Sequence, residues 1–188
     1  MATRLTLLCA GATASSRIGA FPSPAESLDE GGARKAAAYR LRGPRPDLVV
    51  SSPSLAAIET ADALALDAHP EPLLADLDFG DWSGRTLSDV QEAAPPLLLA
   101  WLVDPTQATP GGESMEALVA RVGSWMDCRT DGSKTVLAVC HAAVMRAALS
   151  HALSMPLAGV LRIDIAPLAS MHLSHQGQWR LQELRRAR

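Results

Sequence analysis

The stretch that decides the fold is Leu-Thr-Leu-Leu-Cys-Ala-Gly-Ala-Thr, residues 5–13. Its first half is short and apolar, which is typical of a buried strand, and Gly11 ends the run. A buried strand that runs into a loop of small residues is a common place for the chemistry of α/β enzymes. The thiol of Cys9 is the reactive side chain that stands out in this loop, so the stretch indicates a site but leaves its chemistry open.

Two further short apolar segments end in polar residues. Residues 48–50 are followed by Ser-Ser-Pro at 51–53, and residues 135–140 are followed by His141. The carboxyl ends of parallel strands lie at one edge of a sheet, where ligands of α/β proteins bind. We therefore expect the three strand ends to converge on one site.

Helical patterns alternate with these strands and define the fold class. Expected helices cover residues 33–41, 54–66, 86–92, 96–102, 115–126 and 142–153, and further strands cover 160–165, 171–174 and 179–184. The last three segments lie close together, which favours hairpin or edge pairing, and residues 131–132 (Asp-Gly) mark a turn. The alternation predicts a three-layer α/β/α fold with a mostly parallel sheet, in a single domain over residues 1–188.

The composition limits the classes of function. The 188 residues include 48% hydrophobic and 20% charged residues, with a net charge of −3 and no basic stripe, so we expect no nucleic-acid partner. No apolar run reaches the roughly 18 residues of a membrane helix, and the apolar segment near the N-terminus is too short for a signal peptide. Three unevenly spaced cysteines favour reduced thiols and a cytoplasmic location.

Seven short motifs follow one another along the chain. They are Cys-Ala-Gly-Ala-Thr at 9–13, Leu-Asp-Glu-Gly at 28–31, Ser-Ser-Pro at 51–53, Glu-Thr-Ala at 59–61, Asp-Leu-Asp-Phe-Gly-Asp-Trp-Ser-Gly at 76–84, Pro-Gly-Gly-Glu-Ser at 110–114 and Val-Cys-His at 139–141. In this order they resemble the histidine phosphatase superfamily, in its phosphoglycerate-mutase-like branch. The nearest resemblance is to small bacterial phosphatases of the α-ribazole and broad-specificity type, and it runs over nearly the whole chain.

The resemblance implies phosphoryl transfer from small phosphorylated molecules through a covalent phosphohistidine. The family nucleophile is a histidine at the end of the first strand, and this chain has Ala10 at that position. His141 matches the second histidine of the family, and Asp76 matches the acid that protonates the leaving oxygen. Alanine cannot accept a phosphoryl group, so the resemblance implies the fold more directly than the activity.

The phosphate pocket implied by the resemblance also lacks positive charge. We expect this pocket at Cys9, Gly11, Thr13, Ser16, Arg17, Ser52, Ala56 and Glu113. Cys9 and Ala56 stand where the family has arginines, and guanidinium groups are the usual partners of the phosphoryl oxygens.

Three interpretations of the site remain open at this point. The first, which we prefer, is a degenerate family member without phosphohistidine chemistry that binds a small anion or a partner, needs no cofactor or metal, and is compatible with a homodimer. The second is a working phosphomonoesterase with His141 as base or nucleophile, Asp76 as acid and Arg17 as phosphate clamp. The third is a Cys9–Cys140–His141 thiol, redox or zinc site, against which stands a simple space-filling role for the two thiols.

Overall fold

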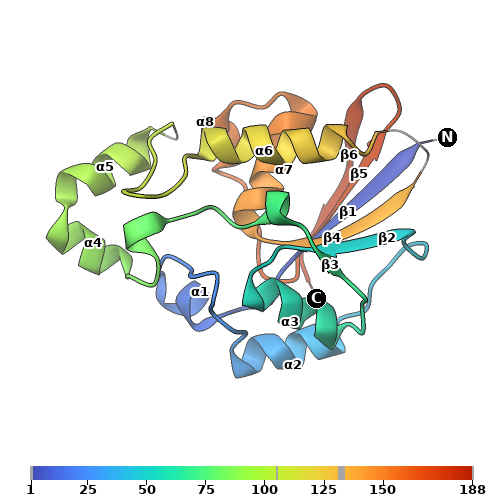
Figure 1. The fold of residues 1–188 in the computed structure, drawn as a ribbon, viewed down its shortest axis with the longest axis horizontal. Coiled ribbons are helices and arrows are strands. Elements are labelled where there is room, and N and C mark those ends of the chain that lie inside the picture. The colour runs from blue at the N-terminus through green and yellow to red at the C-terminus, as the bar shows by residue number, and fades with distance from the viewer. Residues whose placement is uncertain (1, 105, 131–133, 188) are drawn as a thin grey trace.

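The computed structural model describes residues 2–104, 106–130 and 134–187, which form an α/β/α sandwich around one sheet (Figure 1). The strand order is β3-β2-β4-β1-β5-β6. The strands are β1 (Thr3–Cys9), β2 (Leu48–Ser51), β3 (His69–Pro70), β4 (Thr135–Cys140), β5 (Ser170–His175) and β6 (Trp179–Arg185). The strands β1, β2, β3 and β4 pair with one another in parallel, whereas β5 pairs antiparallel with both β1 and β6. The predicted fold class and the mostly parallel sheet are therefore confirmed.

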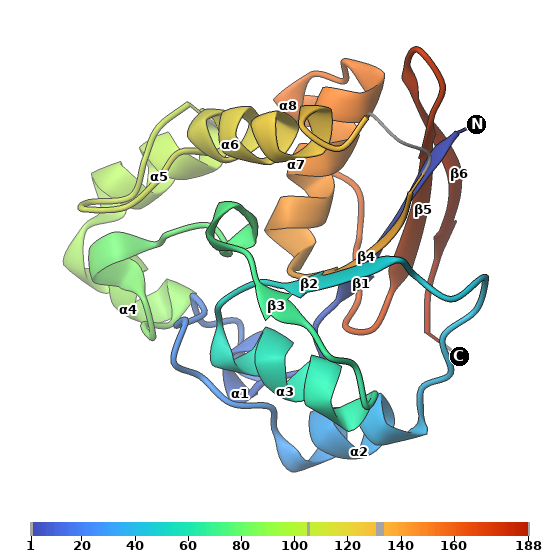
Figure 2. The same ribbon diagram turned by 45° about the vertical axis from the view of Figure 1, so that its right-hand side comes forward.

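Helices cover both faces of the sheet, as Figure 2 shows. The helices are α1 (Ala14–Ile18), α2 (Glu30–Ala38), α3 (Leu55–Ala63), α4 (Leu87–Ala93), α5 (Pro95–Val103), α6 (Met115–Asp127), α7 (Ala142–Leu153) and α8 (Leu157–Val160), with 3-10 turns η1 (Pro72–Leu74) and η2 (Gly80–Trp82). α6 and α7 lie on one face, α2 and α3 on the other, and α4 and α5 extend beyond the edge of the sheet.

The alternation of side chains along β1 explains why both faces are covered. Leu5, Leu7 and Cys9 belong to the core beneath α6 and α7, whereas Leu8 and Ala10 belong to the smaller core beneath α3. Successive side chains of a strand point to opposite faces, so an unbroken apolar run needs an apolar partner on each side. This pattern places β1 in the middle of the sheet, with its C-terminal end at the site.

A cluster of aromatic rings holds the segment between η1 and α4. The ring centroids of Phe21, Phe79, Trp82 and Trp101 lie 5.2 to 6.2 Å apart in tilted or edge-on contacts. Such contacts add to the burial of the large apolar rings. The cluster anchors residues 76–84 next to the strand ends.

The predicted helices and strands match elements of the structure, with ends shifted by up to three residues, except in one place, and α1 and β3 have no predicted counterpart. Residues 160–165 were expected to form a strand, but α8 and a loop occupy this region, so that prediction is wrong. Pro156 precedes a helical turn in which the N–H of Leu161 donates to the carbonyl of Leu157, while Val160 and Ile165 are buried in the core without strand pairing. The turn expected at 131–132 lies outside the described residues.

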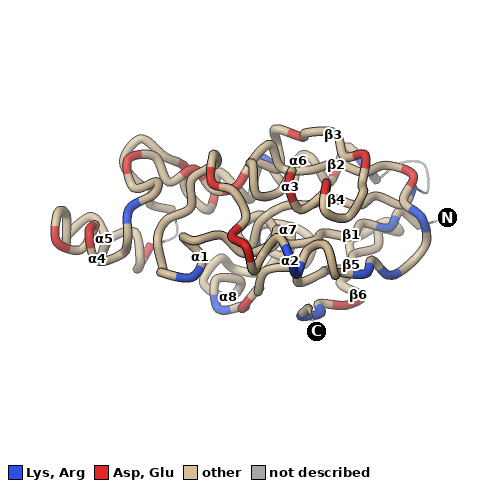
Figure 3. The backbone as a smooth tube through the Cα atoms, turned by 90° about the horizontal axis from the view of Figure 1, so that it is seen from below, with Lys and Arg blue, Asp and Glu red and all other residues tan. Residues whose placement is uncertain are grey.

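Charges of both signs are distributed over the described chain, as Figure 3 shows. None of the described helices has the length and hydropathy needed to cross a bilayer.

Candidate active site

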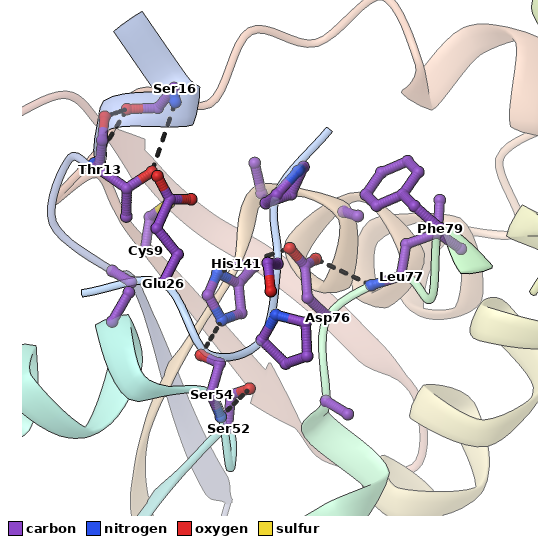
Figure 4. A pocket seen from close by; sticks show the side chains of 18 of the residues that line it. Cys9, Thr13, Ser16, Glu26, Ser52, Ser54, Asp76, Leu77, Phe79 and His141 are labelled. Carbon is purple, nitrogen blue, oxygen red and sulfur yellow. Dashed lines mark hydrogen bonds and ion pairs between the residues drawn. The ribbon is translucent and has the colours of Figure 1, made fainter. Parts of the chain in front are cut away.

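The ends of β1, β2 and β4 meet at one edge of the sheet. Cys9 stands opposite Cys140 in the parallel ladder, and Ser51 stands opposite Val139. The ladder continues past the strands, since the N–H of Ala10 donates to the carbonyl of Cys140 at 2.7 Å. The predicted convergence is confirmed, and a cavity of about 700 Å³ opens beyond these ends (Figure 4).

The loop after β1 is held by backbone contacts that only small residues permit. The N–H of Gly11 donates to Oγ1 of Thr60 on α3 at 2.9 Å. A Cβ on Gly32 would lie 2.2 Å from the carbonyl oxygen of Ala12, so α2 packs directly on the loop backbone. The loop then enters α1 through Thr13, whose side chain accepts the N–H of Ser16 in a capping box.

His141 follows β4 directly and precedes α7, so its imidazole lies in the cavity (Figure 4). Its Nε2 lies 2.6 Å from Oγ of Ser54, and its Nδ1 lies 3.6 Å from Oδ2 of Asp76. The imidazole therefore stands between a hydroxyl and a carboxylate that come from two other segments of the chain.

Two buried thiols, those of Cys9 and Cys140, stand opposite each other at the strand ends. Burial, reinforced by the charge of Asp76, raises the pKa of the Cys9 thiol to about 12, and burial raises the pKa of Cys140 well above its usual value. Both thiols are free and protonated near neutral pH. Within residues 2–104, 106–130 and 134–187, no group of three or more His, Cys, Asp or Glu side chains is placed to hold a metal ion. Both observations count against the Cys9–Cys140–His141 interpretation, which stays a prediction.

The structure brings most of the predicted site residues to the cavity. These are Cys9, Ala10, Gly11, Thr13, Ser16, Ser52, Ala56, Asp76 and His141. At the nucleophile position implied by the resemblance, Ala10 presents only a methyl group.

Arg17 does not lie in the cavity, which corrects its predicted place there. Its Nε and Nη2 donate to the two carboxylate oxygens of Asp29, with Nη2 2.9 Å from Oδ1. These hydrogen bonds lower the pKa of the Asp29 carboxyl to about 2. Arg17 lies on α1 and points toward the N-cap residue of α2, so a local partner twelve residues away holds the guanidinium.

Glu113 also lies outside the cavity, contrary to its predicted place in the phosphate pocket. Nε and Nη2 of Arg121 donate to its two carboxylate oxygens, each at 2.8 Å. The N-cap of α6 is the neighbouring Ser114, so the carboxylate of Glu113 faces the side of α6 instead of the strand ends.

Sequence reasoning missed several polar residues that line the cavity, among them Glu26, Ser54 and Arg146. Glu26 accepts the N–H of Ser15 at 2.8 Å through Oε1, and its Oε2 is buried without a partner among the described residues. The signal for Arg146 is helical spacing, because Ala142, Ala143 and Arg146 share one face of α7 beside His141. For Ser54, the sequence indicates only a role as the N-cap of a helix.

The charges that line the cavity are mostly negative. Glu26, Asp76 and Asp78 contribute carboxylates, and Arg146 is the one Arg or Lys among the described lining residues. Nε of Arg146 donates to the carbonyl of Ile163 at 2.9 Å, which holds the guanidinium beside the cavity.

Comparison with known proteins identifies the family. The model of the histidine phosphatase superfamily, branch 1, matches residues 5–186. A bifunctional protein of Mycobacterium tuberculosis is 36% identical over 180 residues, covering 89% of this chain and 49% of its own length, so the chain spans about half the length of that relative. A mycobacterial glucosyl-3-phosphoglycerate phosphatase superposes with a TM-score of 0.83 at 27% identity, covering 98% of this chain and 99% of its own.

The fold alone is also shared with a putative α-ribazole-5′-phosphate phosphatase from Escherichia coli. The TM-score is 0.88 at 23% identity, over 99% of this chain and 97% of that one. On the family match and the six-stranded fold together, this chain belongs to the histidine phosphatase superfamily, branch 1.

Proposed function

We propose that this domain has no phosphohistidine-based phosphatase activity and uses the family pocket to bind a small molecule. The observation that carries the proposal is Ala10, which lies at the C-terminal end of β1 beside His141 in the cavity. A methyl group cannot form a phosphoenzyme, so the two-step route through a covalent intermediate is closed.

The electrostatics of the cavity support the same proposal. A transferring phosphoryl group needs several cationic or hydrogen-bond donors around its oxygens. Here three carboxylates, from Glu26, Asp76 and Asp78, surround a cavity with one guanidinium, that of Arg146. This lining favours an uncharged or positively charged ligand over a phosphate monoester or an inorganic anion.

The second candidate is a phosphomonoesterase with a rebuilt site. It keeps His141 and Asp76 in the cavity but loses its proposed clamp, because Arg17 is paired with Asp29. Arg146 is the remaining candidate for that role, and one guanidinium among three carboxylates supports phosphate binding poorly.

Three free cysteines support a reducing, cytoplasmic environment as a further part of the proposal. The partner and the oligomeric state remain predictions.

The test is turnover of p-nitrophenyl phosphate between pH 5 and 8, together with trapping of labelled phosphoenzyme under alkaline denaturing conditions. We expect no turnover above that of His141→Ala and no trapped phosphohistidine. His151→Ala is the matched control, because His151 pairs with Asp127 outside the cavity. Turnover that His151→Ala keeps and His141→Ala abolishes would overturn the proposal in favour of the rebuilt phosphatase.

Ligand preference is tested separately by thermal unfolding. Millimolar inorganic phosphate should leave the Tm unchanged, since a ligand raises Tm only when it binds the folded state. A rise in Tm with phosphate that Arg146→Ala removes would show that the cavity binds anions.

A further inference from the structure

His141 links two residues that lie far apart in the sequence. Its Nε2 contacts Oγ of Ser54 at 2.6 Å, and its Nδ1 faces Oδ2 of Asp76 at 3.6 Å (Figure 4). A hydroxyl, an imidazole and a carboxylate in this order are the parts of a serine nucleophile, its general base and the group that orients the base. We infer that Ser54, His141 and Asp76 form a hydrolytic centre for small carboxylic esters. The inference rests on the ligand pocket of the proposed function and needs no phosphate chemistry.

The hydrogen-bond capacity of Ser54 permits this arrangement. A hydroxyl has one proton to donate and two lone pairs to accept. Oγ of Ser54 accepts the N–H of Ala57 at 3.4 Å as the N-cap of α3, which leaves its proton free to donate to Nε2 of His141. The proton of the neutral imidazole is then on Nδ1, on the side of the Asp76 carboxylate.

Asp76 acts on the imidazole through its charge. The separation of 3.6 Å exceeds a normal hydrogen bond, so Asp76 favours the tautomer with Nδ1–H and stabilises an imidazolium without a direct hydrogen bond. The carboxylate is itself oriented, because the N–H of Leu77 donates to Oδ1 at 2.9 Å. Catalytic hydrogen bonds are often longer in the free enzyme and tighten when substrate binds.

Ser54 faces the ligand pocket although its surface is small. Only 5% of the surface of Ser54 is exposed, yet Ser54 lines the cavity together with Ser52 and Pro53. As the N-cap of the nine-residue α3, Oγ also lies at the positive end of a helix dipole, which favours negative charge on the attacking oxygen.

Arg146, on the helix that follows His141, supplies positive charge to the same cavity. Its guanidinium lines the cavity, and only its Nε has a hydrogen-bond partner among the described residues. The Nη atoms are thus available to an oxyanion that develops on the carbonyl oxygen of an ester.

The reaction conserves atoms and protons. Oγ of Ser54 bonds to the carbonyl carbon while its proton passes to Nε2 of His141; the tetrahedral intermediate then expels the alcohol, which takes that proton. Water next gives a proton to Nε2 and its oxygen bonds to the acyl carbon. The acyl–Oγ bond breaks, the proton returns to Oγ, and the carboxylic acid leaves.

The walls of the cavity select the substrate class. Carboxylates of Glu26 and Asp78 repel anionic substrates, whereas the mostly apolar remainder of the lining suits a short acyl or alkyl group. We therefore assign uncharged or positively charged small esters to the site.

The test uses a fluorescent fluorophosphonate and p-nitrophenyl butyrate with the whole chain. We expect covalent labelling that mass spectrometry locates to Ser54, and ester hydrolysis that Ser54→Ala abolishes. His141→Gln should lower both rates by about 100-fold or more, and Asp76→Asn by about 10-fold or more, since each leaves the nucleophile but weakens its base.

Ser114→Ala is the matched control for the loss of a helix cap. Ser114 caps α6 as Ser54 caps α3, but it lies outside the cavity, so this variant should lose similar stability and keep full labelling. If Ser54→Ala does not fold, His141→Gln carries the test alone. Labelling of Ser54 no faster than that of other serines, or unchanged in His141→Gln, would overturn the inference. Phosphate-ester turnover would count against the proposed function and leave the Ser54 result standing.

Discussion

Arg121 binds Glu113 through two hydrogen bonds and also donates to the carbonyl oxygens of Leu73 and Asp76, at 2.8 and 3.0 Å. A helix residue thereby holds the backbone of η1 and of the segment that follows it, and with it the carboxylate that faces His141. The side chains of Arg121 and Glu113 are 20% and 17% exposed, so water competes little for these contacts.

Arg121→Ala should destabilise the fold by about 2 kcal/mol, because it removes charge-assisted hydrogen bonds in a mostly buried place. Arg121→Lys should recover only part of this, since an ammonium cannot bind both carboxylate oxygens and two carbonyls in the same plane. Urea unfolding measures both. Arg34→Ala, which breaks an exposed pair with Glu30 at 4.0 Å, is the control and should change stability by less than about 0.5 kcal/mol. Equal losses in Arg34→Ala and Arg121→Ala would contradict this account.

Gly32→Ala should disturb the loop after β1. Its Cβ would lie 2.2 Å from the carbonyl oxygen of Ala12, so α2 and the loop must move apart at a cost of about 1–3 kcal/mol. Gly159→Ala in α8 is the matched control, since its Cβ would meet nothing nearer than Cε of Met155 at 3.8 Å. Thermal unfolding should show a lower Tm for Gly32→Ala and an unchanged or higher Tm for Gly159→Ala. A neutral Gly32→Ala would mean that the loop does not depend on this contact.

Thiol labelling should distinguish the three cysteines. Cys128 is exposed, whereas Cys9 and Cys140 are buried and have strongly raised pKa values. Iodoacetamide at pH 8 should therefore modify Cys128 in the folded protein and the other two only after denaturation. Peptide mass spectrometry reads the sites directly. Rapid native modification of Cys9 would show that the floor of the cavity is open to solvent and that a thiolate forms there.

The same two thiols should make the fold sensitive to alkali. The pKa of Cys9 rises from 9.0 to about 12 on folding, so the folded state holds a proton that the unfolded state releases. This contribution to stability is fully present below pH 9 and is lost as the pH rises toward 12. Each thiol steepens the loss by about 1.4 kcal/mol per pH unit in that window. Urea unfolding from pH 7 to 10.5 should give a shallower decline for Cys9→Ala than for the natural chain, and parallel declines would contradict the assignment.

The spacing of apolar residues along the chain was sufficient to predict the framework of this fold. The leucines of β1 fall on both of its faces and required cover on each, and the segments that end in Ser-Ser-Pro and Cys-His had to meet β1 at one edge of a parallel sheet. These features follow from the spacing of apolar residues and from the direction of the strands, both of which depend on residues that are close together in the sequence. The strand predicted at 160–165 is wrong because buried β-branched residues pack equally well from a helical turn and a loop. The sequence alone does not show whether such a segment has a strand partner.

The partners of the polar side chains depended on the tertiary structure. Arg17 was predicted in the cavity, but Asp29 holds it elsewhere; Glu113 was predicted there too, but Arg121 binds it. Ser54 and His141 are 87 residues apart and meet only because β2 and β4 are neighbours in the sheet. The sequence by itself thus determined the α/β framework, the position of the site and the alanine at its centre. Only the packed structure decided which charges and hydroxyls reach that site, since a long polar side chain pairs with whichever partner folding brings within about 3 Å.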